Sequence, residues 1–421
     1  MTKLHILVVN DFGTVNGGAG KVALTSAYAL AQHGFSVTVL CAVPPVLPET
    51  PHPNLRFVCT GQQEIRTDPQ RLRAACTGIW NLQAKNTMDQ LLGDCDPAST
   101  VVHAHGWTKA LSSSVLYAAI ARNFPVVVTL HEYFLACPNG GFFDYQKGEV
   151  CHRKPLSLNC ILTHCDSTNY AQKLWRIGRQ FAQKHCAEVP GGLRYFISIS
   201  DLSEKIIAPH LPAARTIFRV PNPIDACKAP PVRVEHNRDL LYVGRIAPEK
   251  GILSMLHAAR AVGMSVTLVG DGAWRERFEK AAVGAVFTGW LSPDQVRSRL
   301  HQARALIFPS LWNETQGLVV MEAAALGVPS VVSDRTAARE FVAGGAPGLC
   351  FEGGNEADLA AKLSLLQDDE VIRRMGEAAY NKYWANPFTM NSHISLLDHC
   401  YKQILADTRA IAAAQSSGIV I

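Results

Sequence analysis

Residues 313–329 read NETQGLVVMEAAALGVP and carry two glutamates separated by seven mostly apolar residues. A strand is disfavoured here, because Glu322 would interrupt it and the run of three alanines favours a helix. We predict a helix that opens at Gly317 and stops at Gly327, two residues before a proline. Glu314 then lies in the preceding loop and Glu322 in the second turn. Both acids lie close to a helix N-terminus, which suits a phosphate group. The competing interpretation is one capping acid and one surface acid.

Strand-like and helix-like runs alternate on the N-terminal side of this segment, which is typical of a parallel α/β sheet. The alternation restarts after VPNPID at residues 220–225. We therefore expect two doubly wound parallel-sheet units that face a central cleft, where ligands meet the carboxyl ends of the strands. Strands are expected at residues 4–9, 36–40, 101–104, 126–130 and 196–199, and again at 240–243, 265–269, 305–308 and 330–332.

The predicted boundaries follow from this restart. The first unit spans residues 1–205 and the second spans 206–385. A last helix begins near Pro387 and is expected to pack back on the first unit within residues 386–421, whose final part, from 412 on, is rich in small residues and is expected to be frayed.

The composition excludes several classes of protein. Of 421 residues, 18% are charged and 48% are hydrophobic, which is typical of a globular chain and not of a disordered one. A net charge of +5 fits small anionic ligands or a membrane surface but is too weak to indicate nucleic acid. The sequence has no run of 18 apolar residues, and its first apolar run, LHILVV, is too short for a signal peptide. We expect a cytoplasmic protein, with the inner face of the cytoplasmic membrane as a further candidate location.

The segment LLYVGRIAPEKG at residues 240–251 predicts a strand that ends at Gly244, followed by a tight loop and a helix. Arg245 and Lys250 bracket the loop. Two cations beside a helix N-terminus would bind a pyrophosphate, with arginine as a fork and lysine as a point charge. The alternative is a pair of surface cations near a turn.

Glycines end two further strand-like runs, and a separate glycine-rich segment follows the first strand. Gly270 in LVGDG and Gly289 in VFTGWL would let the backbone approach the flat ring of a nucleotide base. Residues 17–20 read GGAG but begin too far from the strand for a dinucleotide fingerprint, and the acid expected after the second strand is missing. A P-loop is also excluded, because Val22 stands where its Ser or Thr would be. A flexible loop over the cleft is expected instead.

Histidines lie at strand ends on the predicted cleft edge. His103 and His105 occur in VVHAHGW, and His131 with Glu132 occurs in VVVTLHEY. His131 is the best functional candidate, because this polar pair ends a buried run. No third residue that would join His103 and His105 in a metal site is evident.

Four cysteines cluster with spacings of 13, 8 and 4 residues, without a C-x-x-C pair. We consider two interpretations, buried free thiols or a structural zinc site. The residues are Cys137, Cys151, Cys160 and Cys165.

Just beyond the cysteines, residues 171–184 predict a basic amphipathic helix. It would lie on an anionic membrane or be partly buried with solvated cations. Its cations are Lys173, Arg176, Arg179 and Lys184.

Taken together, these motifs give the chain a family resemblance over nearly its whole length. It resembles the retaining, nucleotide-sugar-dependent glycosyltransferases of family four (group 1), which have the two-domain GT-B fold. The resemblance rests on E-x7-E at residues 314–322, G-R-x-x-x-E-K-G at 244–251 and P-N-x-I-D at 221–225. The G-G-x-G loop and the H-x-H and H-[DE] strand ends occur in the family's order.

The resemblance implies roles on the donor side. The diphosphate of the donor would be held by Arg245 and Lys250, and Glu322 would accept hydrogen bonds from the ribose. Glu314 would contact a hydroxyl of the donor sugar. The first unit would bind the acceptor, and the second unit the nucleotide sugar, without a cofactor or a catalytic metal.

It implies further roles around the cleft. The amides of Gly317 and Leu318 would cap the β-phosphate, and His131 would line the sugar or acceptor side. Gly17 and Gly18 would border both substrates. The family usually has Asp where Glu132 stands and Phe or a similar residue where Gln316 stands, so both changes bear on the choice of sugar.

We therefore expect a glycosyl group to pass from a UDP- or GDP-sugar to a saccharide acceptor with retained anomeric configuration. The expected acceptor is a lipid-linked or surface polysaccharide intermediate, such as that of lipopolysaccharide. The alternatives are a nucleotide-sugar 2-epimerase on the same fold, a catalytically silent sugar-nucleotide-binding subunit and a dinucleotide-dependent oxidoreductase, the last disfavoured by the GGAG loop.

Overall fold

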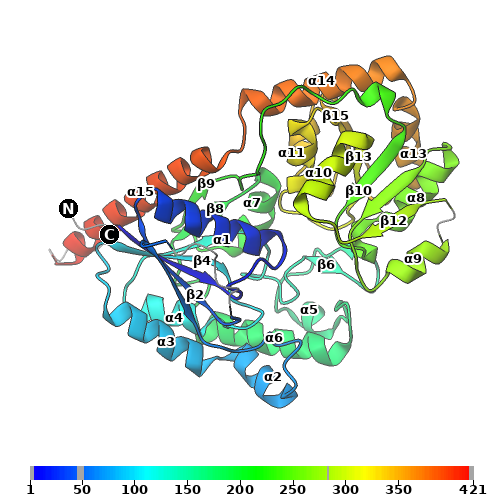
Figure 1. The fold of residues 1–421 in the computed structure, drawn as a ribbon. Helices are drawn as coiled ribbons and strands as arrows, with labels where there is room; N and C mark the ends of the chain where they lie inside the picture. The colour runs from blue at the N-terminus through cyan, green and yellow to red at the C-terminus, as the bar shows by residue number, and fades with distance from the viewer. Residues whose placement is uncertain (1–3, 45–51, 282–283, 417–421) are drawn as a thin grey trace.

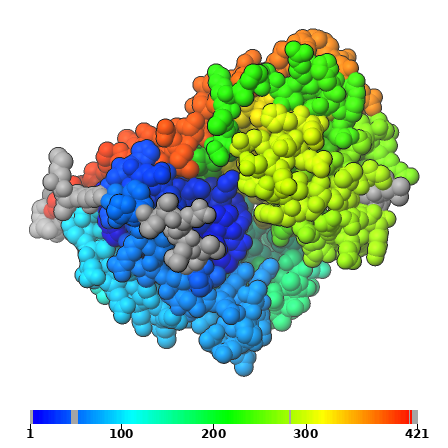
Figure 2. All heavy atoms as spheres, viewed as in Figure 1, coloured from blue at the N-terminus to red at the C-terminus, as the bar shows by residue number. Residues whose placement is uncertain are grey.

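The computed structural model describes residues 4–44, 52–281 and 284–416, which form two parallel sheets in two lobes (Figures 1 and 2). This confirms the expected α/β fold with two doubly wound units. The first sheet has the order β3 (Leu55–Cys59), β2 (Ser36–Cys41), β1 (His5–Asn10), β4 (Thr100–Gly106), β5 (Val126–Thr129), β8 (Tyr195–Ser198) and β9 (Thr216–Arg219).

Helices surround the first sheet, and a short hairpin extends from it toward the second lobe (Figure 1). The helices are α1 (Gly17–Gln32), α2 (Arg71–Ile79), α3 (Leu82–Gly93), α4 (Ser114–Ala121), α5 (Leu158–Leu162), α6 (Tyr170–His185) and α7 (Asp201–Ile207). The hairpin pairs β6 (Phe143–Asp144) with β7 (Glu149–Val150).

The second sheet has the order β12 (Val286–Gly289), β11 (Val266–Val269), β10 (Asp239–Val243), β13 (Ala303–Phe308), β14 (Ser330–Ser333) and β15 (Gly348–Phe351). Its helices are α8 (Ile252–Ala261), α9 (Arg275–Ala281), α10 (Pro293–Gln302), α11 (Leu318–Ala325), α12 (Arg339–Val342), α13 (Glu356–Leu365) and α14 (Asp369–Ala385). A 3-10 turn, η3 (Pro248–Lys250), precedes α8.

The strand β1 shows why the first sheet is covered on both faces. Its side chains alternate between two cores, because successive residues of a strand point to opposite faces. Leu7 and Val9 join one core with α3 and α4, whereas Ile6 and Val8 join the other. Both faces are apolar, so the strand reads as a continuous hydrophobic run, as parallel strands do.

The last helix, α15 (Met390–Ser416), leaves the second lobe and lies along the first (Figure 1). Its residues Leu397 and Ile404 are buried in the same core as Ile6 and Val8. The helix continues past residue 412 to Ser416, where a frayed tail was expected; residues 417–421 lie outside the described part of the chain.

Two boundaries differ from the expectation. The strand β9 pairs with β8, so the first sheet extends to Arg219, past residue 205. The GGAG segment is the first turn of α1 rather than a loop, with Gly17 in a left-handed conformation at a φ of 81°. In the described part of the chain, no helix has both the length and the apolar character that crossing a membrane requires.

Candidate active site

A cavity of about 360 Å³ lies between the two lobes and is lined by both of them. The first lobe contributes Gly18, His131, Glu132, Tyr133 and Gly140, and the second contributes Gly244, Lys250 and residues 312–319. The cavity is therefore at the edge where β5, β10 and β13 end, as the sequence predicted for a doubly wound sheet.

The turn after β10 holds the two predicted cations. Arg245 donates a hydrogen bond of 2.6 Å from Nη2 to Oε1 of Glu249, and its side chain is 58% exposed. Among the described residues, the guanidinium makes no other ion pair, and Arg245 does not itself line the cavity. The turn closes at Gly251, where an added Cβ would lie 2.0 Å from the carbonyl oxygen of Pro309. The close packing against Pro309 thus requires glycine.

Lys250 forms an ion pair with Glu314, and both side chains are largely buried. The Lys250 ammonium also lies 4.9 Å from the ring centre of Trp312. Burial acts to raise the pKa of Glu314, but the charge and hydrogen bond of Lys250 and the polar contacts with Trp312 and Ser310 together outweigh it and hold the pKa below its ordinary value. Ser310 donates a 3.0 Å hydrogen bond to the same carboxylate. Glu314 therefore stays ionised beside the cavity.

The predicted helix is α11, which begins after Gly317 and ends before Gly327. Gly317 has a left-handed φ of 87° and serves as the N-cap, so the first amides of the helix open toward the cavity. Glu322 lies in the second turn and does not line the cavity. Burial raises its pKa, while the charges of Lys21 and Arg297 act against this.

The three predicted glycines at strand ends pack against one another. An added Cβ on Gly270 would lie 1.9 Å from the carbonyl oxygen of Gly244. The amide of Gly270 also donates a 2.9 Å hydrogen bond to the carbonyl of Gly289. This backbone contact explains the glycine at 270. Of the three residues, Gly244 lines the cavity.

The predicted histidine, His131, lies on the opposite wall and is 8% exposed. Its Nε2 is 2.9 Å from Nδ1 of His105. Burial lowers the pKa of His131 to about 3, so its ring is neutral at physiological pH. His103 has a structural role, because its two nitrogens lie 2.7 Å from Tyr401 Oη and Thr129 Oγ1.

Two contacts of the site were not predicted from the sequence. Thr315 donates a 2.9 Å hydrogen bond from Oγ1 to the backbone carbonyl of His131, which joins the two walls. Glu249 fixes one side of Arg245. The first contact depends on how the lobes pack, so no local pattern could reveal it. The contact between Arg245 and Glu249 could have been predicted, because Glu249 follows Arg245 by four residues.

The cysteine cluster requires a correction. The Lys173 ammonium is buried and lies 3.1 Å from Cys165 Sγ and 3.7 Å from Cys160 Sγ. Within the described ranges, no three His, Cys, Asp or Glu side chains are grouped to hold a metal ion. The zinc prediction for Cys137, Cys151, Cys160 and Cys165 is not supported, since a cation already lies against two of the sulfurs. All four are free thiols, and three are buried.

The basic helix α6 also differs from both interpretations of it. Lys173 and Arg179 point inward, and Arg179 donates to the carbonyls of Thr108 and Pro138 at 3.1 and 2.9 Å. Arg176 forms a 2.9 Å ion pair with buried Asp166. Lys184 is exposed. Most of these cations therefore hold α6 to its own lobe.

Comparison with known proteins identifies the family of the chain. Residues 16–227 match the model of Glycosyltransferase Family 4, and residues 225–382 match that of Glycosyl transferases group 1. A glycogen synthase of Mycobacterium tuberculosis is 27% identical over 390 residues, covering 87% of this chain and 86% of the relative. A lipopolysaccharide 1,2-N-acetylglucosaminetransferase of Salmonella typhimurium is 32% identical over 127 residues, covering 26% of this chain and 33% of the relative.

Solved structures share the fold. A sucrose-phosphate synthase from Thermosynechococcus elongatus has a TM-score of 0.70 at 18% identity and covers 96% of this chain and 100% of its own. Anabaena HepE, in complex with UDP and glucose, has a TM-score of 0.62 at 15% identity and covers 95% and 100%. Both family models and the two-lobed fold agree. The chain is a glycosyltransferase that belongs to Glycosyltransferase Family 4.

Proposed function

We propose that this protein transfers a glycosyl group from a UDP- or GDP-sugar to a saccharide acceptor, with retained anomeric configuration. The observation that carries the proposal is the Lys250–Glu314 pair beside the N-terminus of α11, in a cavity that both lobes line. Lys250 and the helix N-terminus suit a diphosphate, and Glu314 suits a sugar hydroxyl.

The charges support a nucleoside-diphosphate sugar as the donor. In the proposed complex, the diphosphate contacts Arg245, Lys250 and the amides of Gly317 and Leu318. A lysine, an arginine fork and a helix N-terminus stabilise the negative charge that develops on the leaving phosphate. These groups supply that stabilisation without a metal ion. Glu314 stays ionised and accepts a hydrogen bond from the sugar.

The opposite wall assigns the acceptor side. His131 is neutral, so it places no charge next to the anomeric carbon. The acceptor enters from the same side as the leaving diphosphate, and the leaving phosphate oxygen takes its proton. Attack from that side retains the configuration. Glu132 lines the cavity and is available to bind acceptor hydroxyls.

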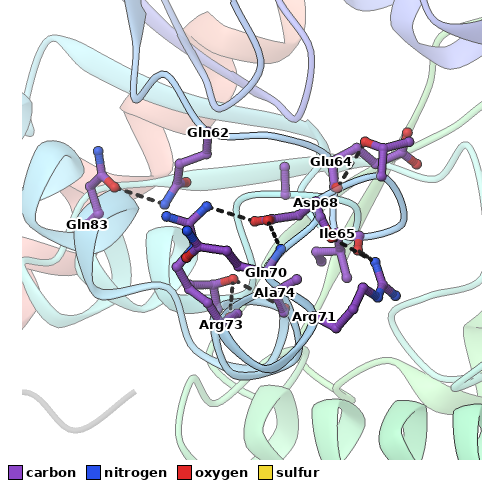
Figure 3. Close-up of polar contacts among 12 residues, drawn as sticks. Gln62, Glu64, Ile65, Asp68, Gln70, Arg71, Arg73, Ala74 and Gln83 are labelled. Atoms are coloured by element: carbon purple, nitrogen blue, oxygen red, sulfur yellow. Dashed lines mark hydrogen bonds and ion pairs between the residues drawn. The ribbon is translucent and has the colours of Figure 1, made fainter.

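The acceptor we propose is a lipid-linked or surface polysaccharide intermediate, as the name of the Salmonella relative suggests. A membrane contact is supported by leucines on α2 and α5. Leu72, Leu158 and Leu162 are 86%, 77% and 72% exposed. Leu72 lies between Arg71 and Arg73, whose guanidiniums turn back onto the loop before α2 (Figure 3).

The test of the reaction is the anomeric configuration of the product, read by NMR from reactions with a panel of UDP- and GDP-sugars in EDTA. We expect an acceptor-dependent product of the same anomeric configuration as the donor. An inverted product would exclude retention, and an epimerised nucleotide sugar without acceptor would favour the epimerase.

The membrane contact is tested by flotation of the protein with anionic vesicles. The double substitution Leu158→Ser with Leu162→Ser should reduce the fraction of protein that floats with the vesicles.

A further inference from the structure

Two buried polar side chains in the cavity have no hydrogen-bond partner among the described residues. Gln316 is 8% exposed, and neither Oε1 nor Nε2 is paired within the described part of the chain. Tyr133 is 2% exposed, and its Oη is likewise unpaired there. Buried polar groups in folded proteins are almost always paired, because an unpaired one is destabilising. Two such groups around one cavity therefore point to a ligand that pairs them.

The position of Gln316 indicates which part of the substrate it meets. It lies two residues after Glu314 and directly before Gly317, the N-cap of α11. Tyr133 comes from the first lobe and follows His131 by two residues. Both line the same cavity. The pair thus lies across the cavity from wall to wall, close to the groups assigned to the sugar.

The chemistry of the two side chains limits the ligand group. The carboxamide offers a donor and an acceptor, and the phenol offers both from one oxygen. Burial, with the charges of Glu314 and Glu340, raises the pKa of Tyr133, so the phenol keeps its proton. Neither group is charged, and the nearby Lys250 is already paired with Glu314. A phosphate or carboxylate would bind more favourably beside Arg245 and Lys250. A hydroxyl group, in contrast, matches a neutral hydrogen-bond donor and acceptor.

We propose that Gln316 and Tyr133 form a neutral subsite that binds a hydroxyl group of the transferred sugar and so selects the donor. The inference rests on the proposed function. A site built to pair a hydroxyl rejects the analogue that lacks it, because the buried polar groups then stay unpaired. Donor selectivity is therefore set here by side chains, in addition to Glu314.

The test uses Gln316→Met, which keeps the length of the side chain and removes both hydrogen-bonding atoms, and Tyr133→Phe. Values of kcat/KM are measured for the best donor and for its singly deoxygenated analogues. For the unmodified protein, one analogue should be at least about 100-fold poorer than the parent. In Gln316→Met that ratio should shrink at least tenfold, and the Kd of the free nucleoside diphosphate should change less than twofold. An unchanged ratio in both variants would overturn the inference.

A matched glutamine controls for structural damage. Gln183 is also buried, but it accepts from Trp107 Nε1 at 3.1 Å and donates to the Phe134 carbonyl at 2.9 Å. Without ligand, Gln316→Met should keep or raise Tm, by roughly 2 °C at most, whereas Gln183→Met should lower it. A fall in Tm for Gln316→Met as large as that of Gln183→Met would show that Gln316 is structural.

The outcomes also separate the inference from the proposed function. If the unmodified protein binds no nucleoside diphosphate and transfers no sugar, both are overturned. If the unmodified protein binds a nucleoside diphosphate and transfers a sugar, the proposed function stands. If Gln316→Met and Tyr133→Phe then show the same ratios of kcat/KM between donors as the unmodified protein, the subsite is rejected.

Discussion

The two walls of the cavity differ in charge. The wall from the second lobe carries the ion pair of Lys250 with Glu314, whereas the wall from the first lobe carries the neutral ring of His131 next to Glu132. In the proposed function, this difference divides the work between the walls. The wall with the lysine and the nearby Arg245 would bind the diphosphate, and the wall whose described lining residues include no cation would face the acceptor. Each prediction below changes one side of this comparison.

The largest effect is expected from removing charge on the second wall. Lys250→Ala should lower kcat/KM at least about tenfold, which corresponds to about 1.4 kcal/mol of lost transition-state stabilisation. Steady-state kinetics with the preferred donor measures it. Lys402→Ala is the control, because Lys402 is an exposed lysine paired with Asp398 on α15. An unchanged rate in Lys250→Ala would remove Lys250 from the diphosphate site.

A smaller effect is expected from the contact that joins the walls. Thr315→Val keeps the shape of the side chain and removes the hydrogen bond to the carbonyl of His131. A neutral hydrogen bond contributes about 1 kcal/mol, so kcat/KM should fall about fivefold. The Kd for the free nucleoside diphosphate should not change, since the lost hydrogen bond connects Thr315 to the first lobe and not to the nucleotide. A loss of nucleotide affinity instead would show that Thr315 acts on the second lobe alone.

The smallest effect is expected in the stability of the neutral wall. Burial lowers the pKa of His103 and of His131 to about 3, below the ordinary value of 6.5. The unfolded chain therefore binds protons that the folded chain does not, and stability should be lost as the pH falls from about 6.5 toward 3. Tm measured from pH 7 to pH 5 should fall less steeply in His103→Asn. Equal slopes would mean that His103 is not held neutral.

The carboxylates act in two directions. The pKa of Glu314 is lowered, so its contribution to stability is present above the unfolded value of 4.5 and is lost only below it. Loss of solvation raises the pKa of Glu132 and of Glu322, which opposes the loss of stability as the pH falls. The difference in slope between His103→Asn and the unmodified protein therefore isolates the contribution of His103.

Much of the architecture could be predicted from the sequence, because both sheets are buried on both faces and their strands are continuous apolar runs. The helix after Glu314 could be predicted from the glycines at its two ends. The strand β9 was not, since TIFR at Thr216–Arg219 is short and partly exposed. The first turn of α1 was missed because its glycines were taken as a loop.

The site divides in the same way. Arg245, Lys250 and Glu314 were found because they lie at strand–helix junctions with readable spacing. The environment of the cysteines was not found, because Lys173 reaches them from another helix. Glu322 is not among the residues that line the cavity, and its contact with a ribose stays a prediction. Contacts between segments distant in sequence were the part that spacing could not show.

The central claim is that the charged wall binds the diphosphate of a nucleotide sugar. Thermal unfolding with millimolar UDP, GDP, ADP or NAD in EDTA tests it most directly, since a ligand at about 100 times its Kd adds roughly 2.7 kcal/mol of stability. We predict that UDP or GDP raises Tm and that Lys250→Ala abolishes the shift. A shift with NAD alone, or no shift with any of the four, would contradict the claim.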